Sequence, residues 1–213
     1  MLNNTKFIYW FLAISYLLTI SISSHQYSFI HKVLPILILL VVAIKSLKGH
    51  GRIFVVSALL FSAMGDVLLA LSLAQSFIYG LAAFAAAHIC YTACFYRWRA
   101  WRRRHFIGVA ILAIYALFML ILLLPVTGAL QIPVLIYLLI ISTMACSAIV
   151  VNTPDYHILL GAVLFVLSDS LLATHKFLFP LPYESLLVMG SYYSAQYLLL
   201  EGCIKKQGSN VLT

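Results

Sequence analysis

Apolar residues form eight long runs along the chain, separated by short polar segments. The runs cover residues 7–23, 33–47, 53–73, 77–96, 106–124, 130–151, 157–175 and 184–203. They are longer and more continuously apolar than the strands of a membrane barrel, which alternate over about ten residues. Backbone groups in lipid must be hydrogen-bonded within the spanning segment, which favours helices. The pattern predicts an all-α polytopic membrane protein with eight transmembrane helices in one domain, residues 1–213.

Composition and charge narrow the class further. The chain is 64% hydrophobic and 8% charged, which is too apolar for a soluble domain of this length. The net charge of +8 does not indicate nucleic acid, because the cations lie in short loops between apolar runs. Lys6 followed by residues 7–22 resembles a signal peptide, but the long stretch and the apolar chain after it favour an uncleaved first helix.

The lysines and arginines predict the orientation of the helices. With eight spans both termini share one side, and that side carries eleven cations, against Lys32 and Lys176 on the other. This asymmetry predicts cytoplasmic termini. The basic loop 97–104 is interpreted as a topology anchor rather than a headgroup site. Compact loops without an organellar signal favour a bacterial inner membrane.

Two of the five acidic residues, Asp66 and Asp169, lie inside apolar runs, where a carboxyl is costly and indicates a functional site. They are 103 residues apart in similar local sequence, Gly65 to Ala70 and Ser168 to Ala173. The offset predicts two parallel four-helix halves, about 1–100 and 106–205, related by an axis along the membrane normal. Helix rise places the two carboxyls about 20 Å and about 18 Å into the membrane, slightly beyond its midplane.

Two carboxyls across a dry cavity are expected to share one proton, so that one is an acid and the other a carboxylate. Such a pair suits acid-catalysed cleavage through an oxocarbenium ion, as in glycosidases. The residues alone do not assign the two roles. A purely structural role, in which each aspartate satisfies polar neighbours, is the alternative.

Other polar residues share the membrane interior. His88 and Tyr91 lie on one helix face, and Tyr192, Tyr193 and Gln196 form a stripe in the last run. Each is a candidate for interhelical hydrogen bonding or for substrate binding. The two outer cations are candidates for interfacial anchoring or for a phosphate clamp. A metal site from both aspartates and His88 is a further alternative, but no ligand spacing supports it, and no metal or other cofactor is predicted.

The chain resembles the YhhN-like family of lysoplasmalogenases from about residue 30 to residue 200. The resemblance rests on these segments, in order: Lys32 to Pro35, Arg52 to Val55, Phe61 to Asp66, Phe84 through His88 to Tyr91 and Phe95, Gly161 to Asp169, Lys176-Phe177, Pro180 to Tyr183, and Tyr192 to Gln196. Single pieces are weak, but the ordered set is specific.

The resemblance implies an integral-membrane ether hydrolase that cleaves the vinyl ether of lysoplasmalogen, an alkenyl glycerophosphoethanolamine or glycerophosphocholine. The products are a fatty aldehyde and the glycerophospho-base. Asp66 and Asp169 are the family aspartates carried over by motif. His88, Tyr91, Tyr193 and Gln196 are expected to line the pocket, and Lys32 and Lys176 to hold the phosphate.

Two other classes stay open at this point. Paired intramembrane aspartates in repeated halves also suit a proton- or cation-coupled transporter, which broken helices beside the aspartates would favour. A metal-dependent lipid amidase or ester hydrolase is the third class. The partners expected are the lysophospholipid substrate and membrane lipid, without nucleic acid. Oligomeric state is not predicted.

Overall fold

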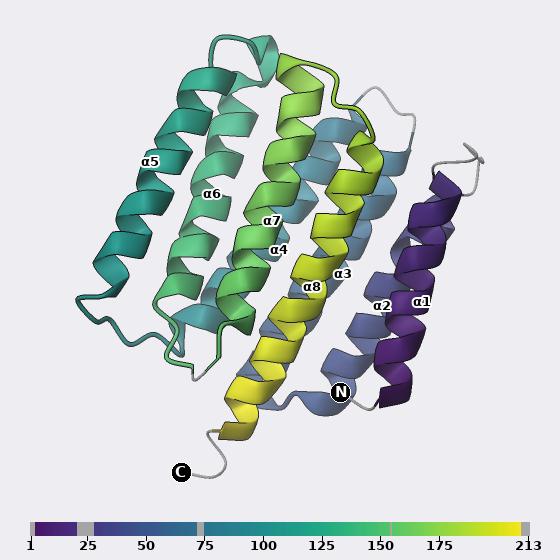
Figure 1. Ribbon diagram of the computed structural model, residues 1–213, viewed down its shortest axis with the longest axis vertical. Coiled ribbons are helices and arrows are strands. Elements are labelled where there is room, and N and C mark those ends of the chain that lie inside the picture. The colour runs from purple at the N-terminus through teal and green to yellow at the C-terminus, as the bar shows by residue number, and fades with distance from the viewer. Residues whose placement is uncertain (1–2, 21–27, 72–74, 154, 210–213) are drawn as a thin grey trace.

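The computed structural model describes residues 3–20, 28–71, 75–153 and 155–209, and these form a bundle of α-helices (Figure 1). The helices are α1 (Asn3–Ile20), α2 (Ser28–Ser46), α3 (Gly49–Ala70), α4 (Ser76–Tyr96), α5 (His105–Leu123), α6 (Gln131–Ile149), α7 (His157–Ala173) and α8 (Glu184–Ser209). A 3-10 turn (Gly128–Leu130) precedes α6, and a π-helical turn (η2, Thr174–Leu178) follows α7. The all-α prediction is confirmed, and each predicted run overlaps one of these eight α-helices. The predicted helix ends at residues 23 and 73 lie outside the described residues.

Six helical segments within the described residues are long and apolar enough to cross a membrane, so the chain is a multi-pass membrane protein. They are Phe29–Ser46, Gly49–Ala70, Ser76–Tyr96, His105–Leu123, Gly128–Ile149 and His157–Leu178. The first and last helices differ: α1 starts with Asn3, Asn4 and Lys6, and α8 carries charged residues near both ends. Eight spans and two four-helix halves therefore stay predictions.

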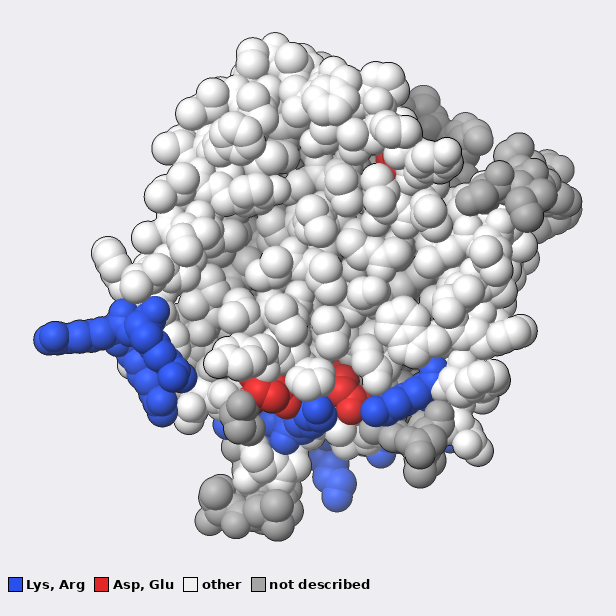
Figure 2. Space-filling model, in the orientation of Figure 1, with Lys and Arg blue, Asp and Glu red and all other residues white. Residues whose placement is uncertain are grey.

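Neighbouring helices run in alternating directions, so α1 begins and α8 ends at the same end of the bundle (Figure 1). Lysine and arginine side chains gather at this end, while most of the visible face above them is uncharged (Figure 2). Many large apolar side chains of the described residues are exposed, among them Phe7 of α1, Ile53 of α3 and Ile114 of α5. This distribution suits a lipid-covered belt. The side of the membrane on which the termini lie stays a prediction.

Helices α7 and α8 pack together closely through glycines. A Cβ atom on Gly161 would lie 2.9 Å from the backbone nitrogen of Leu199, and one on Gly202 would lie 2.9 Å from the backbone nitrogen of Ile158. Because a backbone nitrogen cannot move aside, only glycine fits at these two crossings. Both crossings lie in the first turns of α7, and they hold α8 alongside the helix that carries Asp169 near its other end.

The position of α8 explains its composition. It packs on α7, α2, α1 and α3, and Tyr192, Tyr193, Gln196 and Glu201 are all buried along it. Polar side chains in such a helix face other helices rather than lipid, where they can be hydrogen-bonded. Helix α5 is the opposite case, because it packs mainly on α6 and buries few of its residues.

Candidate active site

A cavity of about 470 Å³ opens near the end of the bundle opposite the termini. Four of the predicted site residues line it: Lys32 from α2, Asp66 from α3, Asp169 from α7 and Lys176 from η2. The two aspartates occupy matching places, each four residues before the last residue of its helix. The structure therefore brings together both carboxyls and both outer lysines, which come from four separate elements.

Asp66 is 1% exposed and is held by two polar partners. The Lys32 ammonium lies 3.2 Å from Asp66 Oδ1, and the Tyr192 hydroxyl donates a 2.8 Å hydrogen bond to Oδ2. An ammonium at this distance and a hydrogen-bond donor both stabilise the charged form of a carboxyl. Gly65, the preceding residue, leaves room for the Phe84 ring, which a Cβ atom would approach to 2.7 Å.

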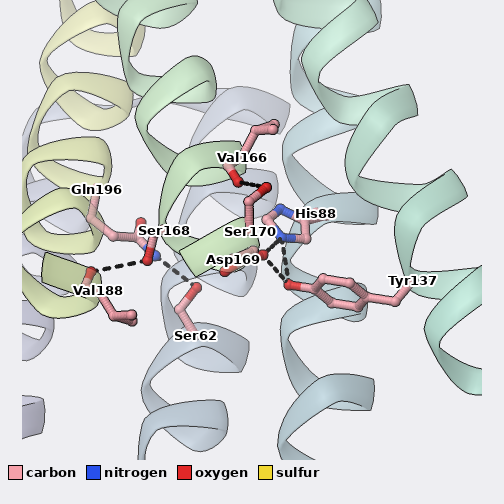
Figure 3. Close-up of polar contacts among 9 residues, drawn as sticks. All are labelled: Ser62, His88, Tyr137, Val166, Ser168, Asp169, Ser170, Val188 and Gln196. Atoms are coloured by element: carbon pink, nitrogen blue, oxygen red, sulfur yellow. Dashed lines mark hydrogen bonds and ion pairs between the residues drawn. The ribbon is translucent and has the colours of Figure 1, made fainter. Parts of the chain in front are cut away.

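Asp169 has a different environment, formed by α4 and α6 (Figure 3). The Tyr137 hydroxyl donates a hydrogen bond to Asp169 Oδ2, and His88 Nε2 lies 3.4 Å from the same oxygen. His88 Nε2 also lies 3.1 Å from the Tyr137 hydroxyl oxygen, so the three side chains form one network. His88 is fully buried, with its ring 4.5 Å from that of Phe165 between centroids. The Asp169 side chain keeps 17% of its surface exposed toward the cavity, against 2% for Asp66.

Four predicted binding residues lie behind the cavity wall, contrary to the expectation that they line it. The Tyr91 hydroxyl donates a 2.6 Å hydrogen bond to Gln196 Oε1. Gln196 Nε2 in turn donates to Ser62 Oγ at 2.9 Å, as Figure 3 shows. The Tyr193 hydroxyl donates to the backbone carbonyl of Lys32 at 2.7 Å. The fourth, His88, reaches the cavity only through Asp169. The close packing of α8 on its neighbours lets these groups satisfy one another, and Tyr193 also fixes the backbone of the lysine beside Asp66.

Lys176 reaches the cavity from the π-helical turn after α7. Its Nζ lies 5.0 Å from the centre of the Phe77 ring, and its side chain is exposed. A backbone hydrogen bond from Phe179 to the Thr174 carbonyl closes the turn. The two lysines thus differ: Lys32 forms a buried ion pair, whereas Lys176 stands at the rim of the cavity.

Two residues of the site carry no distinguishing signal in the sequence. Tyr137 lies in the apolar run 130–151, where a single tyrosine carries no signal that distinguishes it from packing aromatics. Glu184 begins α8 and lines the cavity, but as the first residue of the predicted run 184–203 it could not be distinguished from an ordinary charge at a helix end. Within the described ranges, no three histidine, cysteine, aspartate or glutamate side chains converge as a metal-ligand set.

Comparison with known proteins agrees with this geometry. The family model described as the YhhN family matches residues 27–203, a range that contains both aspartates and both cavity lysines. The chain belongs to the YhhN family. The resemblance noted in the sequence is therefore confirmed.

Several curated relatives of this YhhN protein carry the name lysoplasmalogenase. Proteins of that name from Mycobacterium bovis and Mycobacterium tuberculosis are each 32% identical over 160 residues, covering 72% of the chain and 61% of each relative. Lysoplasmalogenase TMEM86A of Bos taurus is 31% identical over 164 residues, covering 73% of the chain and 66% of the relative. The chain thus spans about three fifths of the mycobacterial relatives it matches. No solved structure matches the chain.

Proposed function

We propose that this YhhN protein is a lysoplasmalogenase that hydrolyses the vinyl ether of alkenyl glycerophosphoethanolamine or glycerophosphocholine within a membrane. The observation that carries the proposal is the cavity that both aspartates and both outer lysines line. Acid chemistry needs a proton donor beside a group that stabilises a cation, and phosphate binding needs a cation at the rim, where Lys176 stands. The names of the relatives support the same reaction.

The surroundings of the two carboxyls support separate roles. Asp66 has an ammonium 3.2 Å away and a tyrosine donor, which suit a carboxylate. Asp169 also accepts a hydrogen bond from a tyrosine, Tyr137, but the His88 ring lies beside it where Asp66 has a lysine ammonium, and its exposed edge faces the cavity. We therefore assign Asp169 as the acid and Asp66 as the carboxylate.

The reaction then proceeds in two stages. The Asp169 carboxyl gives its proton to the β-carbon of the vinyl ether, and the ether oxygen shares its lone pair to form an oxocarbenium ion, which the Asp66 carboxylate stabilises. Water adds to this cation and loses a proton to the Asp169 carboxylate, which restores the acid. The resulting hemiacetal breaks its bond to the glycerol oxygen, its hydroxyl proton passes to that oxygen, and the aldehyde leaves.

Substrate specificity tests the proposed function. Purified protein is incubated with a lysoplasmalogen and, separately, with an ester lysophospholipid of the same headgroup and chain length. We expect fatty aldehyde from the first and no fatty acid from the second. If the ester releases fatty acid and the vinyl ether releases no aldehyde, the protein is an ester hydrolase and this proposal is wrong.

The transporter alternative receives no specific support from the helices. The sequence predicted that a transporter would show a helix break beside the aspartates, but α3 and α7 both continue past Asp66 and Asp169 without a break. The nearest departure from α-helix is η2, which starts five residues after Asp169.

A further inference from the structure

Helices α5 and α7 face each other across an open apolar seam. Gly108, Leu112 and Tyr115 of α5 face Leu159, Val163 and Val166 of α7, and α6 forms the floor between them. Each set recurs every three or four residues, so each lies on one face of its helix. The two helices stand on opposite sides of α6 (Figure 1), which packs on both. The groove between them measures about 1060 Å³; its walls along α5 and α7 are mainly apolar, and its end nearest the termini is lined by charged side chains, among them Arg104, Asp155 and Lys206.

The seam joins the active-site cavity. A narrow space of about 60 Å³ lies between them, and Leu112, Tyr115 and Val166 line both it and the groove. On its other side, the same narrow space shares Asp169 and Phe84 with the active-site cavity. The three spaces therefore lie next to one another, from the proposed acid to the seam, with shared side chains as the walls between them.

One hydrogen bond crosses the seam where it meets the narrow space. The Tyr115 hydroxyl donates to Ser170 Oγ at 2.7 Å, and Ser170 is the residue after Asp169. The remaining walls of the narrow space are almost wholly apolar, with Leu112, Ile141 and Val166 among them. An alkyl chain fits such walls, whereas a polar headgroup would lose its hydrogen bonds there.

We propose that the α5–α7 seam binds the alkenyl chain of a single-chain lipid, which enters sideways between α5 and α7 and displaces Tyr115 from Ser170. This inference rests on the proposed function for the position of the vinyl ether at Asp169. The headgroup then lies at the rim with Lys176, and the chain runs along α7 from Asp169 toward Leu159, near the other end of that helix.

The dimensions agree with one lipid chain. From Asp169 to Leu159 the seam follows ten residues of α7, which is about 15 Å of helix. Half of a hydrocarbon core of about 30 Å, the depth occupied by one leaflet, is the same length. Val163 is 53% exposed along this path, which leaves the seam accessible from the lipid side.

Photolabelling tests the seam without requiring turnover. The probe is an alkyl ether lysophospholipid, which the enzyme cannot hydrolyse, with a diazirine at the end of its chain. In the intact protein in detergent micelles, we expect labels on peptides that contain residues 108–115 and 159–166. Excess unlabelled alkyl lysophospholipid should remove those labels. Labels confined to the outer faces of α1 and α2, or labels that competitor does not reduce, would overturn the proposal.

A seam-filling variant gives a second readout. Leu112→Trp should lower kcat/KM for a hexadecenyl substrate about tenfold relative to an octenyl substrate, since it excludes about two methylenes from the seam. The control Ile114→Trp lies on the same helix at a residue that is 69% exposed, and should leave the ratio unchanged. A ratio equal in both variants would contradict chain binding at the seam.

The two proposals fail in different ways. Competable seam labels in a protein that releases no aldehyde would leave the lipid site standing and remove the proposed reaction. If the protein releases aldehyde but the labels lie elsewhere, the proposed reaction stands and the seam is not where the alkenyl chain binds.

Discussion

The ion pair between Lys32 and Asp66 gives the sharpest prediction about stability. The two side chains are 12% and 2% exposed, and Lys32 Nζ lies 3.2 Å from Asp66 Oδ1. Lys32→Met keeps the length of the side chain but leaves the carboxylate buried without its cation. Breaking a buried pair in this way costs about 3–5 kcal/mol. At roughly 2–4 °C per kcal/mol for a chain of this size, Tm should fall by roughly 6–20 °C.

The assay can use the protein's own thiols. Cys94 and Cys203 are buried and free, so a thiol-reactive fluorogenic dye reports unfolding of detergent-solubilised protein. The matched control is Lys176→Met, since Lys176 lies over the Phe77 ring and such a contact contributes about 0.5–1 kcal/mol at an exposed site. We expect a much smaller fall in Tm for this control.

A double variant separates lost charge from lost packing. Lys32→Met combined with Asp66→Asn removes both charges, and Tyr192 can still donate to the new amide oxygen. The double variant should regain most of the Tm that Lys32→Met loses, while remaining inactive. If Lys32→Met alone leaves Tm unchanged, or if the double variant is no more stable than the single, the argument from a buried charge pair is wrong.

Three further predictions concern the acid, the headgroup and the helix packing. Tyr137→Phe removes the hydroxyl that donates to Asp169 and should lower kcat about 10-fold to 100-fold, with KM little changed in steady-state assays. Lys176→Ala should raise KM for lysoplasmalogen about tenfold if the ammonium binds phosphate, and an unchanged KM would remove the clamp. Gly161→Ala should destabilise the protein by about 1–3 kcal/mol in the dye assay. Gly190→Ala, with no atom within 4 Å of its added Cβ, should instead stabilise it by up to about 1 kcal/mol, so the two shifts in Tm have opposite signs.

Helix positions followed from the sequence because apolar runs long enough to span a membrane must satisfy their own backbone hydrogen bonds. The last run shows the limit of this rule. The helix continues past residue 203 to Ser209, and near this end Glu201 forms a 3.4 Å ion pair with Lys6 of α1. Contacts between helices determine where such a helix ends, and the hydropathy of the sequence gives no information about these contacts.

Residues of the candidate site could be predicted from the sequence where burying the side chain in an apolar run costs free energy. Asp66 and Asp169 stand out because a carboxyl in an apolar run is costly to bury and indicates a functional site. Both lie in similar local sequence, which placed them at comparable points of two helices. Tyr137 did not stand out, because a tyrosine in an apolar run is common in packing and its partner is 32 residues away. Tyr91 and Gln196 were found as polar stripes, but only the packing of α8 shows that they bond each other.

Hydrolysis in deuterated water, followed by mass spectrometry of the trapped aldehyde, tests the central claim most directly. If Asp169 protonates the β-carbon, its carboxyl proton is first exchanged for deuterium from the solvent, and each aldehyde molecule then carries one deuterium at carbon 2. The folded Asp169→Asn variant should release little aldehyde. Aldehyde without deuterium at carbon 2, or near-full release by folded Asp169→Asn, would contradict proton transfer from this carboxyl to the vinyl ether.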